Sequence, residues 1–250
     1  MKKAVALLGT QRRQNTFRLL GEIGEILAKH GIALEVIELY RYDIQFCAGC
    51  DRCILNGECV WKDDAEELME RLAEADGVIL ASPVYLQQVS GKLKTFLDRT
   101  CRWYHRPVLT GKPMLAVAST KGSGLKKTLS YLESIAVQWG AMPAGKVGRT
   151  IFNQDRKISE REVERFVCLM EQPERYSPSL GQMIDFEVQK SMALFLGKLD
   201  RAYWEEKGWV DRPYYFPCRI YRPYALISRG IGGLIRSKMK GGGKEDPTHP

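Results

Sequence analysis

Short apolar runs alternate with amphipathic helical patterns along the first 170 residues of this chain. This alternation is typical of β-α units, which build a parallel sheet with helices on both of its faces. Parallel strands buried on both faces have continuous apolar sequences, as these runs do. The sequence therefore predicts an α/β fold, a doubly wound five-stranded parallel sheet, with strands at residues 4–8, 33–39, 77–81, 114–119 and 144–147.

Between these runs, apolar residues recur at helical spacing and form one stripe in each predicted helix. Three such stripes lie within residues 19–27, 65–72 and 125–139. Asp64, followed three positions later by Glu67, is typical of a capping box that opens the second helix. The stripes are predicted to pack in the core and to carry no chemistry.

The pattern changes after residue 172, which we take as the end of the first domain. Residues 176–179 read as a linker, and apolar spacing over residues 184–199 predicts one long amphipathic helix, followed by many aromatic residues. This mainly helical C-terminal extension, residues 173–240, is expected to pack on its own domain or across a dimer. A role in covering the cofactor is the alternative. Residues 241–250 are predicted to be a disordered tail.

The net charge of +8 comes from Lys and Arg spread over most of the chain, except that residues 219–244 hold seven of them and no Asp or Glu. Such a basic end is one way to contact a membrane surface or nucleic acid. No apolar stretch has the length of a membrane-spanning helix, and the N-terminus lacks a cleavage site. We therefore expect a cytoplasmic protein.

The segment from Gly9 to Thr16 follows the first predicted strand directly and leads into a helix. Free backbone amides and the helix dipole meet at such a point and attract an anion. Thr10, Asn15 and Thr16 supply hydrogen-bond donors, and Arg12 adds positive charge. The dinucleotide and triphosphate loop motifs are absent, so a phosphomonoester is favoured. The alternative is an ordinary helix cap beside solvated arginines.

Two more loops leave the carboxyl ends of strands, where open parallel sheets bind their ligands. The third strand runs into Ser82, Pro83, Val84 and Tyr85, whose backbone amides and aromatic ring suit a flat heterocycle. The alternative there is an ordinary loop before a helix capped by Ser90. The fourth strand leads into a small, flexible turn that permits close approach to a ligand; its candidate residues are Ser119, Thr120, Lys121, Gly122 and Gly124.

Four of the seven cysteines, Cys47, Cys50, Cys53 and Cys59, fall within thirteen residues. In a reducing compartment this spacing indicates a metal or redox site and not a disulfide framework. Three thiols so close together favour iron-sulfur over zinc. Zinc and free or reversibly oxidised thiols remain alternatives. The other three cysteines, Cys101, Cys168 and Cys218, are scattered and are interpreted as buried or incidental thiols.

The order of these motifs resembles the NADPH-dependent FMN reductase branch of the flavodoxin-like superfamily over about residues 1–170. The residues that carry it are Gly9, Thr10, Arg12, Asn15 and Thr16, then Ser82 to Tyr85, Ser90, Gly91, Leu93, Lys94, Asp98 and Arg99. The resemblance implies FMN phosphate in the first loop, the isoalloxazine against residues 83–85, and further contacts from residues 119–124. For Lys94, Asp98 and Arg99 we predict an ion pair that holds the helix.

The cysteine spacing, after the second strand, is similar to that of the iron-sulfur flavoproteins, and implies a [4Fe-4S] cluster near the flavin. The expected function is an FMN-dependent NAD(P)H oxidoreductase, because the cofactor carries the hydride chemistry. No catalytic acid or base is predicted. A quinone, a flavin or a ferredoxin-like carrier accepts the electrons, and the resemblance implies a homodimer. The alternatives are a non-enzymatic electron carrier, or a binding or regulatory protein using the basic end.

Overall fold

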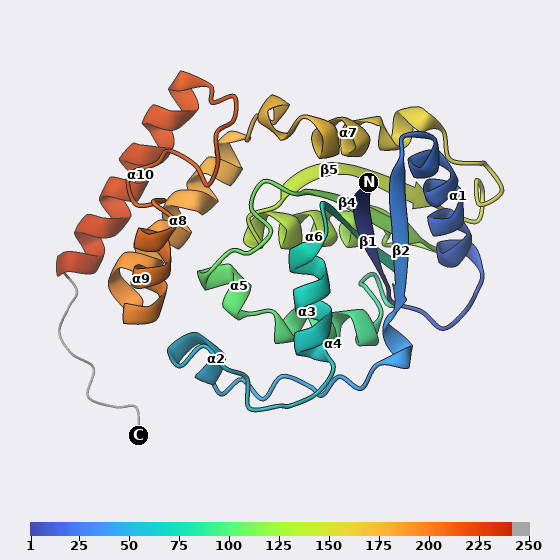
Figure 1. Ribbon diagram of the computed structural model, residues 1–250, viewed down its shortest axis with the longest axis horizontal. Coiled ribbons are helices and arrows are strands. Elements are labelled where there is room, and N and C mark those ends of the chain that lie inside the picture. Colours follow the sequence, from blue (N-terminus) through green and yellow to red (C-terminus); the bar gives the residue numbers. More distant parts are fainter. Residues whose placement is uncertain (242–250) are drawn as a thin grey trace. The chain divides into compact units, whose positions relative to one another are not determined.

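The computed structural model of the chain describes residues 1–241, which are traced in Figure 1. It divides after Tyr176 into two compact units, and each is described separately below. The first unit holds the sheet, and the second, from Ser177 onward, is helical.

All five predicted strands are confirmed, and they form one sheet in the order β2-β1-β3-β4-β5 with every pairing parallel. This is the flavodoxin-like strand order. Strand β2 is added on one side of β1, and β3, β4 and β5 are added on the other, so the order switches direction between β1 and β3. Leu8 pairs with Ala81, so β1 and β3 end side by side. The strands are β1 Lys2–Leu8, β2 Ile32–Glu38, β3 Gly77–Pro83, β4 Pro113–Ser119 and β5 Met142–Arg149.

Helices cover both faces of the sheet (Figure 1). One face carries α1 (Asn15–Lys29) and α7 (Glu160–Glu171), and the other carries α3 (Ala65–Glu74), α4 (Gly91–Arg99) and α6 (Leu125–Gln138). The apolar stripes of the second group pack with β1, β3 and β4 in one buried cluster. The short elements are η1 Leu39–Arg41, α2 Arg52–Leu55, α5 Arg102–His105 and η2 Pro173–Arg175.

The predicted capping box at α3 is wrong. Asp64 occupies the position before the helix but makes no capping hydrogen bond with its side chain. Its carboxylate instead accepts a hydrogen bond from the backbone amide of Asp43 at 2.7 Å, which ties down the preceding loop. Ser90, by contrast, caps α4, as the alternative interpretation of this loop had it, and accepts from the backbone amide of Leu93.

The second unit contains α8 (Leu180–Leu196), α9 (Lys198–Glu206) and α10 (Arg222–Gly241). The long helix predicted over residues 184–199 is confirmed as α8, but it ends at Leu196. Gly197 adopts an extended conformation that ends α8 and begins α9. The predicted tail beyond Gly241 lies outside the described residues.

The core of the second unit joins aromatic rings to a buried ion pair. Phe186 packs against Trp204, Tyr214 and Tyr215 with ring centroids 4.7–5.6 Å apart. Glu187 on α8, only 2% exposed, pairs with Arg236 on α10 at 2.7 Å. The face that these contacts bury is not the predicted one. Helix α8 buries Met183, Phe186 and Glu187, whereas Phe195 and Leu199 of the predicted apolar stripe are 36% and 40% exposed.

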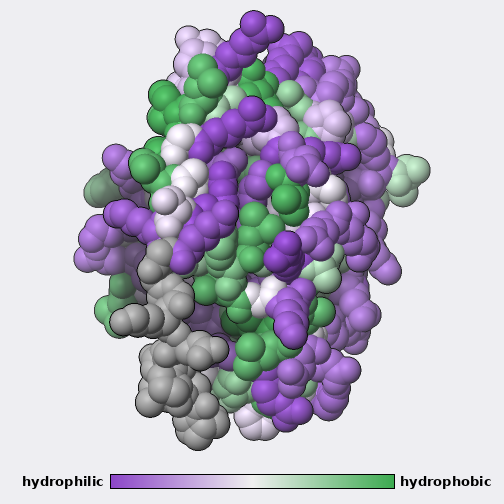
Figure 2. Space-filling model, turned by 90° about the vertical axis from the view of Figure 1, so that its left-hand side faces the viewer, coloured by the Kyte–Doolittle hydropathy of each residue, from purple (hydrophilic) through white to green (hydrophobic). Residues whose placement is uncertain are grey.

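The outer face of α10 exposes apolar side chains among charged ones. Figure 2, which views the side on which α10 lies, shows hydrophobic residues between hydrophilic ones, and Leu226 and Leu234 are 72% and 67% exposed. In the described part of the chain, no helix is long and apolar enough to cross a membrane.

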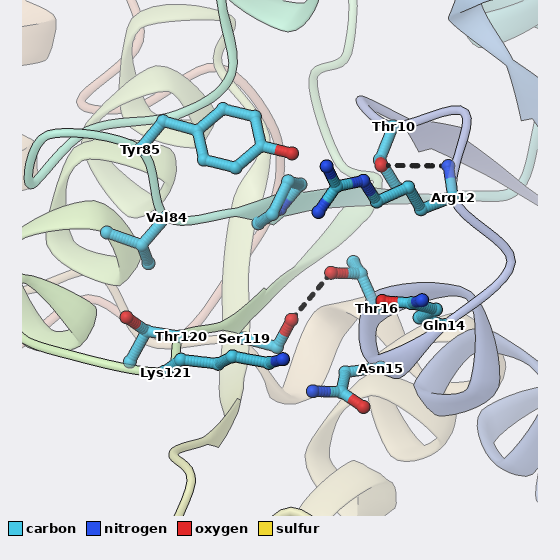
Figure 3. A pocket seen from close by; sticks show the side chains of 11 residues that line it. Thr10, Arg12, Gln14, Asn15, Thr16, Val84, Tyr85, Ser119, Thr120 and Lys121 are labelled. Atoms are coloured by element: carbon cyan, nitrogen blue, oxygen red, sulfur yellow. Dashed lines mark hydrogen bonds between the residues drawn. The ribbon is translucent and has the colours of Figure 1, made fainter.

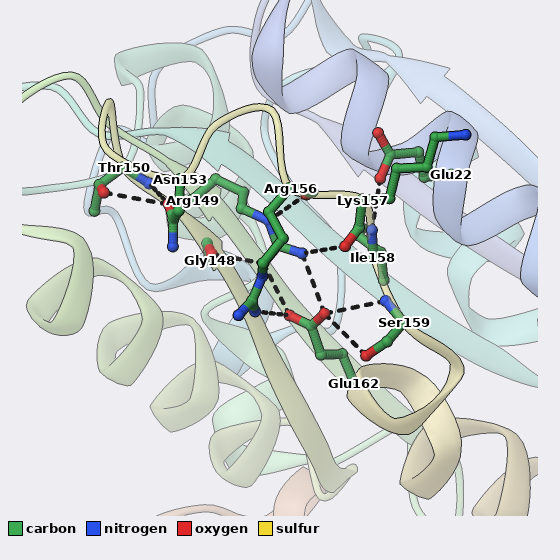
Figure 4. Close-up of polar contacts among 10 residues, drawn as sticks. All are labelled: Glu22, Gly148, Arg149, Thr150, Asn153, Arg156, Lys157, Ile158, Ser159 and Glu162. Carbon is green, nitrogen blue, oxygen red and sulfur yellow. Dashed lines mark hydrogen bonds and ion pairs between the residues drawn. The ribbon is translucent and has the colours of Figure 1, made fainter.

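A buried arginine at the end of β5 organises the loops on one side of the sheet (Figure 4). Arg149 is 1% exposed, and its guanidinium donates two hydrogen bonds to the carboxylate of Glu162, at 2.8 and 3.1 Å. It also donates to the carbonyls of Arg156 and Lys157. Because the Arg149 carbonyl accepts from the amide of Thr120 at 2.9 Å, the same residue positions the loop after β4.

The Arg149 contact predicts a pH-dependent contribution to stability. Its hydrogen bonds lower the pKa of Glu162 to about 2, from an ordinary value of 4.5. Glu162→Gln should reduce the free energy of unfolding at pH 7 by about 2 kcal/mol, because a charge-assisted hydrogen bond is lost. Since the carboxylate is favoured in the folded state, the difference from wild type should persist above pH 4.5 and shrink as the pH falls toward 2.

Urea unfolding at a series of pH values measures this difference. Glu164→Gln, at an exposed position of the same helix, is the matched control and should change stability little. A difference for Glu162→Gln that stays constant down to the lowest pH would show that the ion pair does not stabilise the fold.

Candidate functional site

The three loops that follow β1, β3 and β4 meet in one pocket (Figure 3). Ten of the fourteen residues predicted for the cofactor site line it, together with Gln14, which the sequence analysis did not select. Of the remaining four, Gly9, Ser82 and Gly124 do not line the pocket but support the loops that form it. The lining residues are Thr10, Arg12, Gln14, Asn15, Thr16, Pro83, Val84, Tyr85, Ser119, Thr120 and Lys121.

One end of the pocket is suited to an anion. Helix α1 begins there at Asn15, and it has neither a side-chain cap nor an acidic residue in its first turn. Its positive dipole end and its free amides therefore remain available. Arg12 and Lys121 extend into the space between the loops (Figure 3). Thr16 and Ser119 share a buried hydrogen bond of 2.7 Å that joins the first and third loops.

The other end of the pocket is formed by a tight turn that presents Tyr85. The backbones of Tyr85 and Gln88 exchange two hydrogen bonds, at 2.8 and 3.0 Å. Leu86 and Gln87 between them have φ of 48° and 66°, which is typical of a type I′ turn. Residues other than glycine rarely adopt these angles, and such strain is common at functional sites.

Gly124 is required where the third loop passes this turn. Its φ is +92°, and a Cβ there would lie 2.6 Å from the Cα of Gln87. Only glycine avoids both the strained backbone angle and the clash. Gly124 therefore serves the site without lining it, whereas Gly122 has open space around it.

Gly9 and Ser82 support the first and second loops in a similar way. The Gly9 amide donates to the carbonyl of Ala81 at 2.9 Å, and a Cβ on Gly9 would lie 2.6 Å from the hydroxyl of Ser90. Ser82 accepts from the amide of Ser90 at 2.9 Å. The small residues at these positions let the two loops approach one another directly.

A residue of the 150–158 segment contacts a side chain that lines the pocket, and no motif in the sequence predicted this contact. The side-chain amide of Asn15 donates to that of Gln154 at 3.3 Å. Arg149 holds this segment through its carbonyls. No local pattern points to Gln154, because only the tertiary fold brings it to α1.

The second candidate site is a small cavity around the cysteine loop. All four predicted ligand cysteines line it, and Cys101, interpreted from the sequence as incidental, joins them. Within the described residues, no group of three or more His, Cys, Asp or Glu side chains is arranged to hold a metal ion. The cavity is lined by Cys47, Ala48, Gly49, Cys50, Asp51, Cys53, Cys59, Val60, Trp61, Arg99 and Cys101.

Arg99 joins helix α4 to this loop through a buried ion pair. The ion pair predicted on α4 is confirmed between Lys94 and Asp98. Arg99 does not join it and pairs instead with Asp63, whose Oδ1 lies 3.0 Å from the Arg99 Nη2. Arg99 also donates to the carbonyl of Gln45 at 3.0 Å. It donates as well to the sulfur of Cys59, at 3.2 Å. A positive charge and a hydrogen-bond donor thus face one thiol of the loop.

Cys53 and Cys101 form a sulfur pair with Sγ atoms 3.5 Å apart. The hydrogen bond with Cys101 lowers the pKa of Cys53 to about 6, against the opposing effect of burial, and the charge of Arg102 acts in the same direction. The same hydrogen bond and burial raise the pKa of Cys101. The hydrogen bond between them therefore favours the thiolate on Cys53 over the thiolate on Cys101.

The chain is similar to known flavoproteins. Residues 2–153 match the NADPH-dependent FMN reductase family. An iron-sulfur flavoprotein of Archaeoglobus fulgidus is 32% identical over 222 residues, which span 83% of this chain and all of the relative. An iron-sulfur flavoprotein of Methanocaldococcus jannaschii is 32% identical over 53% of this chain and 70% of its own length.

Two solved structures share the fold. A crystal structure of RosB with the bound intermediate 8-demethyl-8-formylriboflavin-5'-phosphate has a TM-score of 0.57 at 15% identity, covering 100% of this chain and 90% of that one. An NADH:FMN oxidoreductase in its apo form has a TM-score of 0.50 at 20% identity, covering 69% and 88%.

The Arg99 contact predicts that Asp63→Asn loosens the cysteine loop. Burial alone would raise the pKa of Asp63, but hydrogen bonds from Arg99 and from backbone amides lower it. Loss of the carboxylate leaves a buried guanidinium without its counter-charge, which should cost about 3 kcal/mol in the free energy of unfolding. Amide exchange of residues 45–63 should also accelerate.

The control is Asp98→Asn. It also removes one carboxylate charge, but from the exposed Lys94–Asp98 pair on α4, the helix that carries Arg99. Hydrogen-exchange mass spectrometry and urea unfolding compare the two variants. Equal effects of both substitutions would show that the Arg99–Asp63 pair does not hold the loop.

Proposed function

This chain belongs to the NADPH-dependent FMN reductase family, in its iron-sulfur flavoprotein branch, and we propose that it transfers electrons from NAD(P)H through FMN and a [4Fe-4S] cluster to a one-electron protein carrier. It is an FMN-dependent oxidoreductase. The donor, the cluster and the carrier are the proposed parts.

The observation that carries the FMN assignment to these residues is the two-ended pocket. Its cationic end combines Arg12, Lys121 and the uncapped start of α1, which suits a phosphate dianion. Its other end offers Pro83 and the Tyr85 ring, which suit a planar heterocycle. A molecule with a phosphate at one end and a flat ring at the other fits both.

When bound, FMN supplies a hydride acceptor that releases electrons one or two at a time. The residues around it position and shield it. Thr10 and Thr16 have hydroxyl groups at the anion end, and the buried Thr16–Ser119 contact fixes the distance between two of the loops. The strained turn keeps the half-exposed Tyr85 ring at the edge of the pocket, where it limits access of water.

The cluster proposal rests on the chemistry of the cysteine cavity. Cys47, Cys50, Cys53 and Cys59 would hold the cluster, because four thiolates from one compact loop are the donors that iron-sulfur clusters use. Zinc is the alternative metal. A guanidinium that donates to a ligand sulfur favours the reduced cluster, and Arg99 is placed to act on Cys59 in this way.

A cluster accepts single electrons, so its presence favours a ferredoxin-like carrier as acceptor. Without a cluster, FMN alone would pass its electrons to a quinone or a free flavin. Anaerobic NADPH oxidation assayed with each acceptor discriminates between the two. A faster rate with the quinone in iron-loaded protein would contradict the proposed carrier.

The anion end predicts that Arg12→Ala weakens FMN binding about 10-fold to 100-fold, because a charge-assisted hydrogen bond to phosphate is lost. Binding of riboflavin, which lacks the phosphate, should change little. Fluorescence titration of apoprotein measures both. Arg13→Ala is the matched control, since Arg13 pairs with Glu38 and does not line the pocket. Equal losses for FMN and riboflavin would contradict phosphate binding at Arg12.

The cysteine cavity predicts that Cys50→Ser abolishes a cluster without removing FMN, because the exposed Cys50 supports no packing contact of the flavin pocket. Iron and sulfide assays after anaerobic reconstitution, with flavin absorbance recorded in the same sample, separate the two cofactors. Cys168→Ser, outside the cavity, should retain both. Full iron content in Cys50→Ser, or zinc in its place in wild type, would overturn the proposed cluster.

A further inference from the structure

Cys53 and Cys101 are contributed by different parts of the first unit. Cys53 belongs to α2 in the cysteine loop, and Cys101 directly precedes α5. Both side chains are half-buried, both line the same cavity, and their Sγ atoms are 3.5 Å apart. All seven cysteines are free thiols in this structure.

Backbone contacts hold these two sulfurs together. Arg106 in the segment after α5 donates to the carbonyls of Cys53 and Ile54, the latter at 3.1 Å. Arg102 on α5 donates to the carbonyl of Gly57 at 3.2 Å. Two arginines thus fasten both ends of the 53–57 turn to the segment that carries Cys101, so the sulfur pair is a fixed feature and not a chance side-chain contact.

The other cysteines of the loop are placed differently. Cys47 and Cys50 are exposed. Cys59 accepts a hydrogen bond from Arg99. Within the described residues, Cys53 and Cys101 are the pair of sulfurs in hydrogen-bond contact. A movement of about 1.5 Å would bring them to the distance of a disulfide bond, which is about 2 Å.

We propose that Cys53 and Cys101 form a reversible disulfide by exchange with a low-molecular-weight disulfide such as oxidised glutathione, and that this bond competes with an iron-sulfur cluster for the Cys53 sulfur. The disulfide depends only on the thiol pair. The competition rests on the proposed function, since it requires that Cys53 is a cluster ligand.

The exchange balances in two steps. The Cys53 thiolate attacks oxidised glutathione, so a mixed disulfide forms on Cys53 and one glutathione thiolate leaves. The Cys101 sulfur then attacks the Cys53 sulfur, which forms the intramolecular bond and releases the second glutathione. One glutathione takes the proton that Cys53 released to water on becoming a thiolate, and the other takes the proton of the Cys101 thiol. The protein is oxidised by two electrons, and one glutathione disulfide is reduced.

The competition follows from the chemistry of the ligand. A cluster requires Cys53 as a thiolate ligand. A Cys53 sulfur in a disulfide bond with Cys101 is neutral and cannot bind iron in this way. Oxidation would therefore remove one of four ligands and block assembly of the cluster, and reduction would restore the site. A bound cluster would in turn shield Cys53 from exchange.

The first experiment treats reduced, cluster-free, full-length protein with oxidised glutathione, blocks the remaining thiols and digests it with trypsin. Wild type should yield peptide 53–62 joined to peptide 100–102, and fragmentation should assign the bond to Cys53 and not to Cys59, which shares the peptide. Cys101→Ser should lose this link and retain glutathione on Cys53. Cys168→Ser is the matched control and should keep the link.

The absence of the joined peptide in wild type, or links only among residues 47–59, would overturn the disulfide. The second experiment adds iron and sulfide anaerobically before the oxidant. Iron loading should suppress the link, and oxidation before loading should suppress iron uptake until a reductant is added. Reduced Cys101→Ser should bind iron as wild type does.

Loss of iron in reduced Cys101→Ser would identify Cys101 as a ligand and overturn its proposed role. If reduced wild type takes up no iron, the cluster of the proposed function fails and the competition fails with it. Detection of the joined peptide in cluster-free protein tests separately whether Cys53 and Cys101 form a disulfide.

Discussion

The parallel pairing of β1, β3 and β4 is the constraint on which the loop pocket depends. Parallel strands place all of their carboxyl ends at the same edge of a sheet, so the three following loops have to share one region. The register of the pairs then sets how closely they meet. Because Leu8 pairs with Ala81 and Pro83 with Ser119, the loops leave the sheet at nearly the same level. The pocket forms where they converge.

Buried arginines hold the loops in the positions that this edge allows. Arg149 ties the segment after β5 to α7 and, through its carbonyl, to the third loop. Arg99 ties the cysteine loop to the end of α4. A buried guanidinium is costly without a counter-charge, and each is matched by a carboxylate, Glu162 or Asp63. The same residues that stabilise the loops therefore determine their geometry.

In the function proposed above, the two sites would divide the chemistry between them. The loop pocket suits a flavin phosphate and ring, whereas the cysteine cavity offers sulfur donors for single-electron transfer. Arg99 and Cys101 stand near the end of α4, two positions apart, and contact different thiols of the cysteine loop. Helix α4, which Ser90 caps beside the flavin pocket, thus leads from one site to the other.

The sequence alone was enough to predict the five strands and to select the loop residues at their carboxyl ends and the four closely spaced cysteines. Hydrophobic periodicity and short motifs are local properties of the chain, so they can be recognised without the fold. The sequence did not predict hydrogen-bond and ion-pair partners that lie far apart along the chain. Asp64 accepts a hydrogen bond from a loop amide instead of capping its helix. The ion pair predicted on α4 forms between Lys94 and Asp98, but Arg99 pairs with Asp63 outside that helix.

Gln154 and Cys101 lie far along the chain from the residues that they contact, and no spacing rule connects them. Their places follow from how helices pack on the sheet, and only the folded chain determines that packing.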